Sequence, residues 1–115
     1  MKVSEVTANA WLNELFGGGA WLQMHIGDPG DDGTQNFVDA SRIFVDFYAA
    51  TSGSISSQPA NGIVPPSTMV WTHFSLWSAV IDGELKWKDT LLTNVPVSSG
   101  LTTPLPAGAL VLSIG

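Results

Sequence analysis

The strongest constraint on the fold of this chain is a pair of alternating segments joined by a short turn. Residues 72–79 (THFSLWSA) and 84–88 (ELKWK) both follow the period of two that is typical of β-strands. The residues between them, Ile81, Asp82 and Gly83, favour a hairpin turn. We therefore expect two antiparallel strands, with Leu85 and Trp87 of the second strand facing the core.

The rest of the chain predicts one helix and several more short strands. Residues 4–16 are predicted to be helical, because Ser4 or Thr7 can cap the helix and the run of glycines at 17–19 can end it. From residue 20 onward, turn signals separate about seven or eight short strands, a pattern typical of all-β folds. We predict a mainly β fold, an antiparallel β-sandwich with one N-terminal α-helix. It should form a single domain over residues 1–115, with the helix and Gly-rich turn in 1–19 and the sandwich in 20–115. The apolar stripe of the helix is expected to consist of Val6, Ala10, Trp11 and Leu15.

The charge content restricts the partners of this chain. It has 115 residues, a net charge of −6 and only four Lys and Arg residues. Four cations cannot form the basic surface that nucleic acids or anionic membranes require, so neither is expected as a partner. Only 12% of the residues are charged, about half of the usual ~25%. This low fraction indicates that much of the surface is buried against a partner or other copies, so we expect a homo-oligomer.

Several classes of site and of protein are not indicated by the sequence. The chain contains no Cys, which excludes disulfides, thiolate metal sites and a Cys nucleophile. No secretory signal and no apolar segment long enough to span a membrane are visible, so we expect folding in a cytoplasm. No serine-nucleophile elbow, phosphate-binding loop or pair of catalytic carboxylates is present. We therefore predict that the chain is not an enzyme and has no catalytic residues, metal or cofactor.

Two histidines and an Asp-rich loop are the candidate polar sites. His25 and His73 lie in apolar strands without a third ligand placed beside them, so each is expected to hydrogen-bond inside the sheet. The loop that contains Asp28, Asp31 and Asp32 lacks the spacing of a calcium loop. Because Asp and Gly are also ordinary turn formers, calcium binding is the less favoured alternative.

Arg42 is the only Arg of the chain and lies in an otherwise apolar strand. It could pair with Asp28 or Asp31 and so pin the acidic loop to the sheet. The alternative is a plain exposed charge on a strand, since surface ion pairs contribute little.

The five Trp residues have two possible uses. Aromatic side chains commonly fill small β cores and subunit interfaces, and Trp77 and Trp87 are expected in the core. The predicted interface consists of Trp11, Leu15, Phe16 and Trp21, which flank the Gly run. The alternative is a platform of exposed rings on which carbohydrate stacks.

Four segments, in order, resemble a family of small structural proteins of tailed bacteriophages. Residues 22–30 (LQMHIGDPG) are similar to its "LxLHTGDPG" opening, and residues 40–47 (ASRIFVDF) to a following strand. Residues 72–79 are similar to its "THFGIWDA" strand, and residues 99–112 (SGLTTPLPAGALVL) to its ending. The resemblance implies a virion protein of the tail-fibre, minor tail or capsid-decoration type.

Within that range, we expect a capsid decoration (cement) protein that self-associates and docks on the major capsid protein lattice. The chain shows no coiled-coil shaft or collagen-like spacer, and a trimer is a common solution for decoration proteins. The alternative is a tail-fibre or tail-tip structural protein that binds host carbohydrate. In either case the chain is expected in the virion, with the helix at residues 4–16 making assembly contacts.

Overall fold

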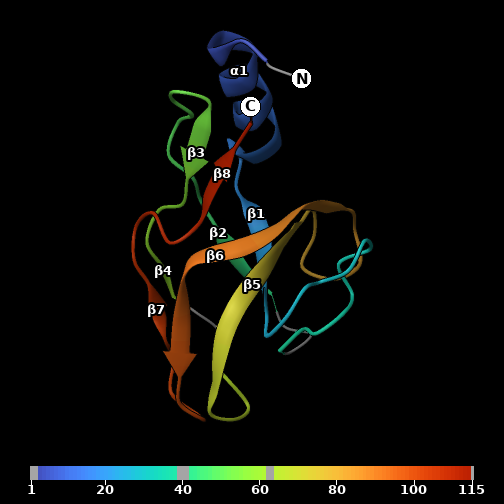
Figure 1. Ribbon diagram of the computed structural model, residues 1–115, viewed down its shortest axis with the longest axis vertical. Helices are drawn as coiled ribbons and strands as arrows, with labels where there is room; N and C mark the ends of the chain where they lie inside the picture. Colours follow the sequence, from blue (N-terminus) through green and yellow to red (C-terminus); the bar gives the residue numbers. More distant parts are fainter. Residues whose placement is uncertain (1–2, 39–41, 62–63, 115) are drawn as a thin grey trace.

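The computed structural model describes residues 3–38, 42–61 and 64–114. It confirms a mainly β fold with one N-terminal helix, and every strand pair is antiparallel. The elements in order (Figure 1) are α1 (Glu5–Phe16), β1 (Ala20–His25), β2 (Ile43–Val45), β3 (Ser54–Ser56), β4 (Ala60–Asn61), β5 (Met69–Trp77), β6 (Leu85–Val97), β7 (Pro104–Leu105) and β8 (Val111–Ser113).

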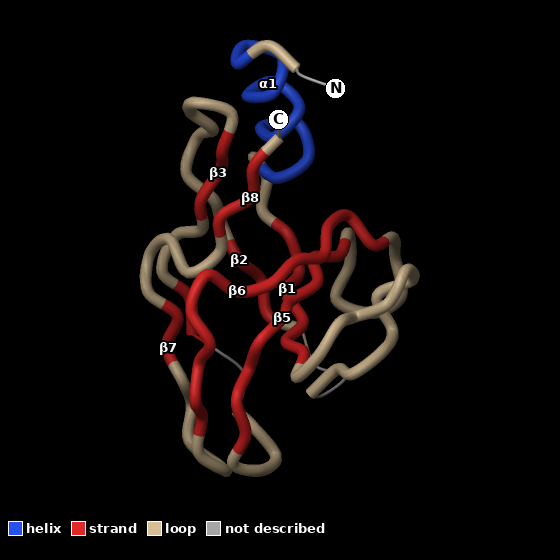
Figure 2. Tube along the Cα trace, viewed as in Figure 1, coloured by secondary structure: helices blue, strands red, loops and turns tan. Residues whose placement is uncertain are grey.

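The centre of the molecule is a four-stranded sheet with the order β2-β1-β5-β6 (Figure 2). Strands β1 and β5 pair Leu22 with Leu76, and both of these side chains are fully buried. The predicted hairpin forms between β5 and β6. Its turn is made by Asp82 and Gly83, whose φ angles of 55° and 74° match a turn that needs two residues in the left-handed region. The alternating segments 72–79 and 84–88 therefore form the long hairpin of the sheet.

Two short ribbons complete the β structure. Strand β3 pairs with β8, and β4 pairs with β7, so the eight described strands form three sheets. Next to the β3–β8 ribbon, Ser57 and Leu110 are joined by two hydrogen bonds. The Ser57 N–H donates to the Leu110 carbonyl at 3.0 Å, and the buried Ser57 hydroxyl accepts the Leu110 N–H at 3.0 Å. The molecule is elongated, 43 × 26 × 22 Å. Helix α1 lies at one end of the long axis and the loops before β5 and after β6 lie at the other (Figure 1).

Helix α1 begins and ends as the sequence predicts, but its buried face is different. The Ser4 hydroxyl accepts the Thr7 N–H, so Ser4 is the cap, and the Gly17 N–H donates to the Asn13 carbonyl. The buried face consists of Ala8, Leu12 and Phe16. The predicted stripe was wrong, because its members are exposed in the structure: Val6, Ala10, Trp11 and Leu15.

One contiguous core joins the helix to all three sheets. Phe16 of α1 packs against the ring of Phe47 at 5.3 Å and against the half-buried Trp87 of β6 at 6.0 Å. The largest fully buried side chains include Trp71 and Phe74 of β5 and Leu112 of β8. Among the described residues no helix is long and apolar enough to cross a membrane.

Candidate functional site

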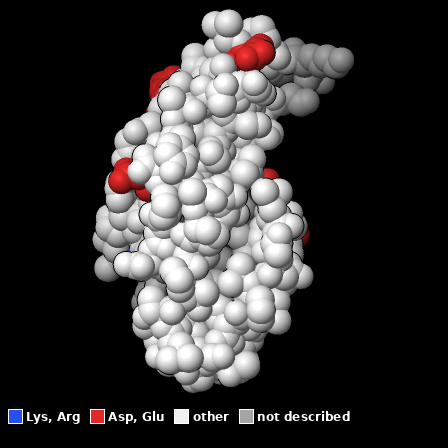
Figure 3. All heavy atoms as spheres, turned by 90° about the vertical axis from the view of Figure 1, so that its left-hand side faces the viewer, with Lys and Arg blue, Asp and Glu red and all other residues white. Residues whose placement is uncertain are grey.

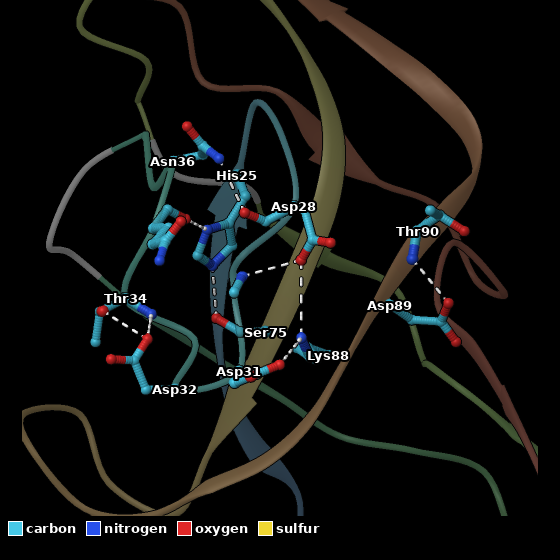
Figure 4. Close-up of polar contacts among 12 residues, drawn as sticks. His25, Asp28, Asp31, Asp32, Thr34, Asn36, Ser75, Lys88, Asp89 and Thr90 are labelled. Carbon is cyan, nitrogen blue, oxygen red and sulfur yellow. Dashed lines mark hydrogen bonds and ion pairs between the residues drawn. The ribbon is translucent and has the colours of Figure 1, made fainter.

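The first candidate site is a hydrogen-bonded chain that holds the loop after β1 against the sheet. His25 is fully buried, with Nδ1 2.8 Å from the Gln35 carbonyl and Nε2 2.7 Å from the Ser75 hydroxyl (Figure 4). A carbonyl can only accept, so Nδ1 carries the proton and Nε2 accepts from Ser75. The Ser75 oxygen in turn accepts the Trp77 indole N–H at 2.8 Å. Every polar atom of this imidazole is satisfied, so His25 is a structural residue that fixes the loop to β5.

The second histidine does not join His25 in a site of its own. His73 pairs with His25 in the register of β1 and β5, and its Nδ1 lies 2.7 Å from the Thr72 hydroxyl. In the part of the chain that the structure describes, no three His, Asp or Glu residues gather closely enough to hold a metal ion. Desolvation by burial is the main influence on His25 and lowers its pKa, which keeps the ring neutral.

The carboxylates of Asp28 and Asp32 accept hydrogen bonds from residues of the acidic loop itself. Asp28 accepts the Gly30 N–H at 2.9 Å, and Asp32 accepts both the Thr34 hydroxyl at 2.7 Å and its N–H at 3.1 Å. These are the short-range turns in which Asp side chains replace backbone partners. The Gly30 N–H, followed by the charge of Lys88, lowers the pKa of Asp28. The Thr34 hydroxyl and N–H lower the pKa of Asp32.

Lys88 of β6, and not Arg42, is the cation beside this loop. Its Nζ lies 3.7 Å from Asp28 and 3.9 Å from Asp31 (Figure 4). Both carboxylates are exposed, so these pairs are screened by water and hold the loop weakly. Lys88 is not among the site residues predicted from the sequence. The alternation of residues 84–88, which places Lys86 and Lys88 on one face of the strand, was the signal available for it.

Arg42 pins a different loop from the one predicted. Its guanidinium donates to the carbonyls of Ala79 and Asp82, both at 2.8 Å, and lies 4.1 Å from the centre of the Trp77 ring. The residue precedes β2 beside Gln23 of β1, whose side-chain oxygen is 3.4 Å from Nε. From this position Arg42 reaches the turn between β5 and β6. It therefore orders that turn through backbone carbonyls, and partial burial lowers its pKa.

A cleft of about 620 Å³ lies between the acidic loop and the β5–β6 turn, with Arg42 in its wall. Three exposed apolar side chains border it, Phe37 and Val80 with 46% and Ile81 with 74% of its surface accessible. The cleft thus combines a guanidinium, a carboxylate and apolar surface. Its lining residues are Gln23, Gly33, Thr34, Phe37, Arg42, Trp77, Val80, Ile81 and Asp82.

The four residues predicted to form an interface are found in different environments. Trp11 and Leu15 are exposed on α1, at 45% and 38%. Phe16 is fully buried in the core of its own chain, so it has no surface to offer a partner. Trp21 is half-buried on β1 and its ring packs edge-on against Phe44 at 5.4 Å. The interface therefore stays a prediction, carried by Trp11 and Leu15.

The position of the Phe44 ring also explains why residue 19, in the Gly run, is a glycine. Gly19 has a φ of +84°, and a Cβ placed on it would lie 2.3 Å from the Phe44 ring. Gly is favoured there because it tolerates this φ, and a larger residue would displace the Phe44 ring. The Trp21 and Phe44 rings are inclined by 67°, so they form no coplanar platform of the kind that sugars stack on.

One comparison with known proteins gives a match. The family described as "Podophage GP4 fiber I protein gp80" matches residues 2–113, which is nearly the whole chain. No curated protein matches the sequence. The match supports the tail-fibre alternative better than the main expectation of a capsid decoration protein.

Proposed function

The chain belongs to the podophage GP4 fiber I protein gp80 family, a family of phage fibre proteins, and we propose that it attaches to a neighbouring tail protein through helix α1. As a fibre protein it is a non-enzymatic structural component of the virion. Because the family is one of fibre proteins, the match favours the tail fibre over the expected role as a capsid decoration protein. The family match over residues 2–113 is the observation that carries the fibre role.

The exposed side of α1 supports its use as the attachment surface. Ala8, Leu12 and Phe16 already anchor the helix in the core. Two further large apolar side chains, Trp11 and Leu15, lie one helical turn apart and remain exposed. Trp is among the residues most enriched at the centres of protein interfaces. Covering this pair would remove apolar surface from water without disturbing the contacts that hold the helix.

The test is incorporation of variants into particles. Phage lacking its own copy is grown in a host that supplies the protein as wild type, as Trp11→Glu or as Glu14→Gln. Mass spectrometry of purified particles then measures the amount of this protein relative to the major capsid protein. We expect Trp11→Glu to reduce incorporation at least tenfold, while Glu14→Gln, an exposed change on the same helix, leaves it unchanged. Normal incorporation of a folded Trp11→Glu protein would refute attachment through α1.

Point substitutions are better than removal of the helix for this test. Leu12 and Phe16 are fully buried, so deleting residues 4–16 would also take away part of the core. A deletion would lower incorporation through unfolding even if α1 touched no partner. Circular dichroism of each purified variant confirms that the fold is retained.

The cleft beside Arg42 supports a second candidate function, binding of host-surface carbohydrate by the fibre. Its guanidinium, carboxylate and exposed aromatic ring are groups that bind hydroxyls and apolar sugar faces. Phe37 and Phe44 are equally exposed, at 46%, but only Phe37 lines the cleft. In titrations with host polysaccharide followed by Trp fluorescence, Phe37→Ala should lose the response and Phe44→Ala should keep it. Equal responses of both variants would exclude the cleft.

A further inference from the structure

Charged residues are confined to part of the sequence. Residues 47–81 and 90–115 contain no Asp, Glu, Lys or Arg, although together they make up more than half of the chain. All charged side chains lie in residues 1–46 and in the short segment 82–89 around the hairpin turn. Ordinary soluble surfaces mix both signs of charge throughout, so the distribution needs an explanation.

Parts of both uncharged segments meet at the end of the molecule opposite α1, while the β3–β8 ribbon, which is also uncharged, lies beside α1. Strand β4 pairs with β7, and Val70 of β5 pairs with Pro96 of β6. The loops beyond them are also joined, since the Gly100 N–H donates to the Pro65 carbonyl at 3.1 Å. We call this region, residues 58–61, 64–72 and 90–108, the neutral end. In Figure 3 no Lys, Arg, Asp or Glu side chain is visible in the lowest third of the face shown.

The neutral end also exposes several large apolar side chains. Leu92 has 71% of its surface accessible, Leu101 64%, Val64 51% and Val70 45%. Single exposed apolar residues are common, but an uncharged region that carries four of them is typical of a surface that a partner covers.

The outer edge of β6 provides a specific docking feature within the neutral end. Strand β6 is an edge of the central sheet, paired only with β5 in the described part of the chain. Residues 91–94 form a bulge opposite Thr72, because the register passes from Trp71–Val95 to His73–Thr90. A groove of about 310 Å³ runs between this bulge and residues 104–109, with Leu91, Leu92 and Leu105 in its walls. An unpaired strand edge beside an apolar groove can accept backbone and side chains from another molecule.

We propose that the neutral end is the surface through which copies of this chain associate with one another. Two molecules of net charge −6 repel when their charged parts approach. Contact between two neutral ends brings no like charges together, and it buries apolar side chains of both molecules. A charged partner would find no complementary group here, whereas a second copy offers the same uncharged, apolar and hydroxyl-rich surface. The inference extends the proposed fibre role, in which α1 at the opposite end remains available for the neighbouring tail protein.

The experiment places one negative charge either within the neutral end or outside it. Leu92→Glu adds it to the neutral end, and Ile26→Glu, at a residue that is 52% exposed beside the acidic loop, is the matched control. Sedimentation equilibrium of the full chain measures the dissociation constant of self-association. We expect wild type and Ile26→Glu to associate equally, and Leu92→Glu to associate at least tenfold more weakly. Leu101→Glu should repeat the effect of Leu92→Glu at a second position.

Two results would overturn the proposal. One is a wild-type protein that remains monomeric at all concentrations studied, and the other is equal self-association of Leu92→Glu and Ile26→Glu. Unchanged circular dichroism and melting temperature establish that each variant is folded. Incorporation of Trp11→Glu into particles is measured separately, so loss of attachment through α1 and loss of self-association are told apart.

Discussion

The Nε2 atom of His25 on β1 lies 2.7 Å from the hydroxyl of Ser75 on the neighbouring strand β5. The opposite ring nitrogen donates to the carbonyl of Gln35 in the loop after β1. A neutral imidazole therefore connects the central sheet to the loop that borders the cleft. Protonation would place a second N–H against Ser75 and a charge in a buried position, so this connection is sensitive to pH.

We predict that acid weakens the fold through His25. Burial lowers the pKa of His25 below its ordinary value of 6.5. Between pH 6.5 and the lower folded value, the unfolded chain binds a proton that the folded chain excludes. The free energy of unfolding should therefore fall as the pH decreases through this window, by at most ~1.4 kcal/mol per pH unit for one proton. Urea unfolding at pH 7 and at pH 5 measures the difference.

The two histidines provide the control for this prediction. His73→Gln should keep the pH dependence, and His25→Gln should remove it. The pKa values of Asp28 and Asp32 are also lowered, but from an ordinary 3.8, so their contribution is lost at more acidic pH. If His25→Gln does not fold, NMR titration of the wild-type ring protons decides the matter. A His25 that titrates at or above pH 6.5 would contradict the account.

We predict that Arg42 stabilises the β5–β6 turn more than Lys88 stabilises the acidic loop. Arg42→Ala removes two 2.8 Å hydrogen bonds and the contact with the Trp77 ring, so the free energy of unfolding should fall by ~1–2 kcal/mol. Arg42→Lys should restore only part of this, since an ammonium lacks the planar donors. Lys88→Ala breaks only exposed ion pairs and should change stability little. Urea unfolding that shows Lys88→Ala to be the more damaging change would refute this assignment.

We predict opposite behaviour for two aromatic residues of α1. Phe16→Ala leaves a cavity beside Phe47 and Trp87 and should lower the free energy of unfolding by ~3–5 kcal/mol. Trp11→Ala, at an exposed position, should lower it by ~1 kcal/mol or less. Thermal unfolding of both variants tests which face of the helix is buried. Equal losses would mean that the helix is rotated relative to the structure.

We also predict that residues 1–115 unfold as one domain. The core is continuous from Leu12 of α1 to Leu112 of β8, so the helix should not detach before the sheet. Helix content followed by far-ultraviolet circular dichroism and Trp environment followed by fluorescence should give one melting temperature. Two separate transitions would show that the helix and the β structure are independent units.

The local elements could be predicted from the sequence because short-range chemistry fixes them. Ser4 caps α1, and Asp82 and Gly83 turn the β5–β6 hairpin, as their residue types indicate. The satisfied, buried state of His25 also followed from its apolar strand. The cap and the turn depend on residues close in the chain, and the burial of His25 follows from the apolar residues around it in its strand.

The remaining features depend on contacts between distant segments. Helix α1 has apolar residues around much of its circumference, so the sequence alone could not select Ala8, Leu12 and Phe16 over Trp11 and Leu15. Arg42 is 37 residues from Ala79 and 40 from Asp82, and its partners are backbone carbonyls that any sequence would offer. Only the pairing of the strands brings these groups together.

The most direct test of the fibre role is the number of copies of this protein in purified particles. Quantitative mass spectrometry against the major capsid protein measures the ratio. A fibre protein belongs to the tail, so we predict that capsid subunits greatly outnumber it. A ratio near one copy per capsid subunit would instead place the protein across the capsid lattice and contradict the fibre assignment.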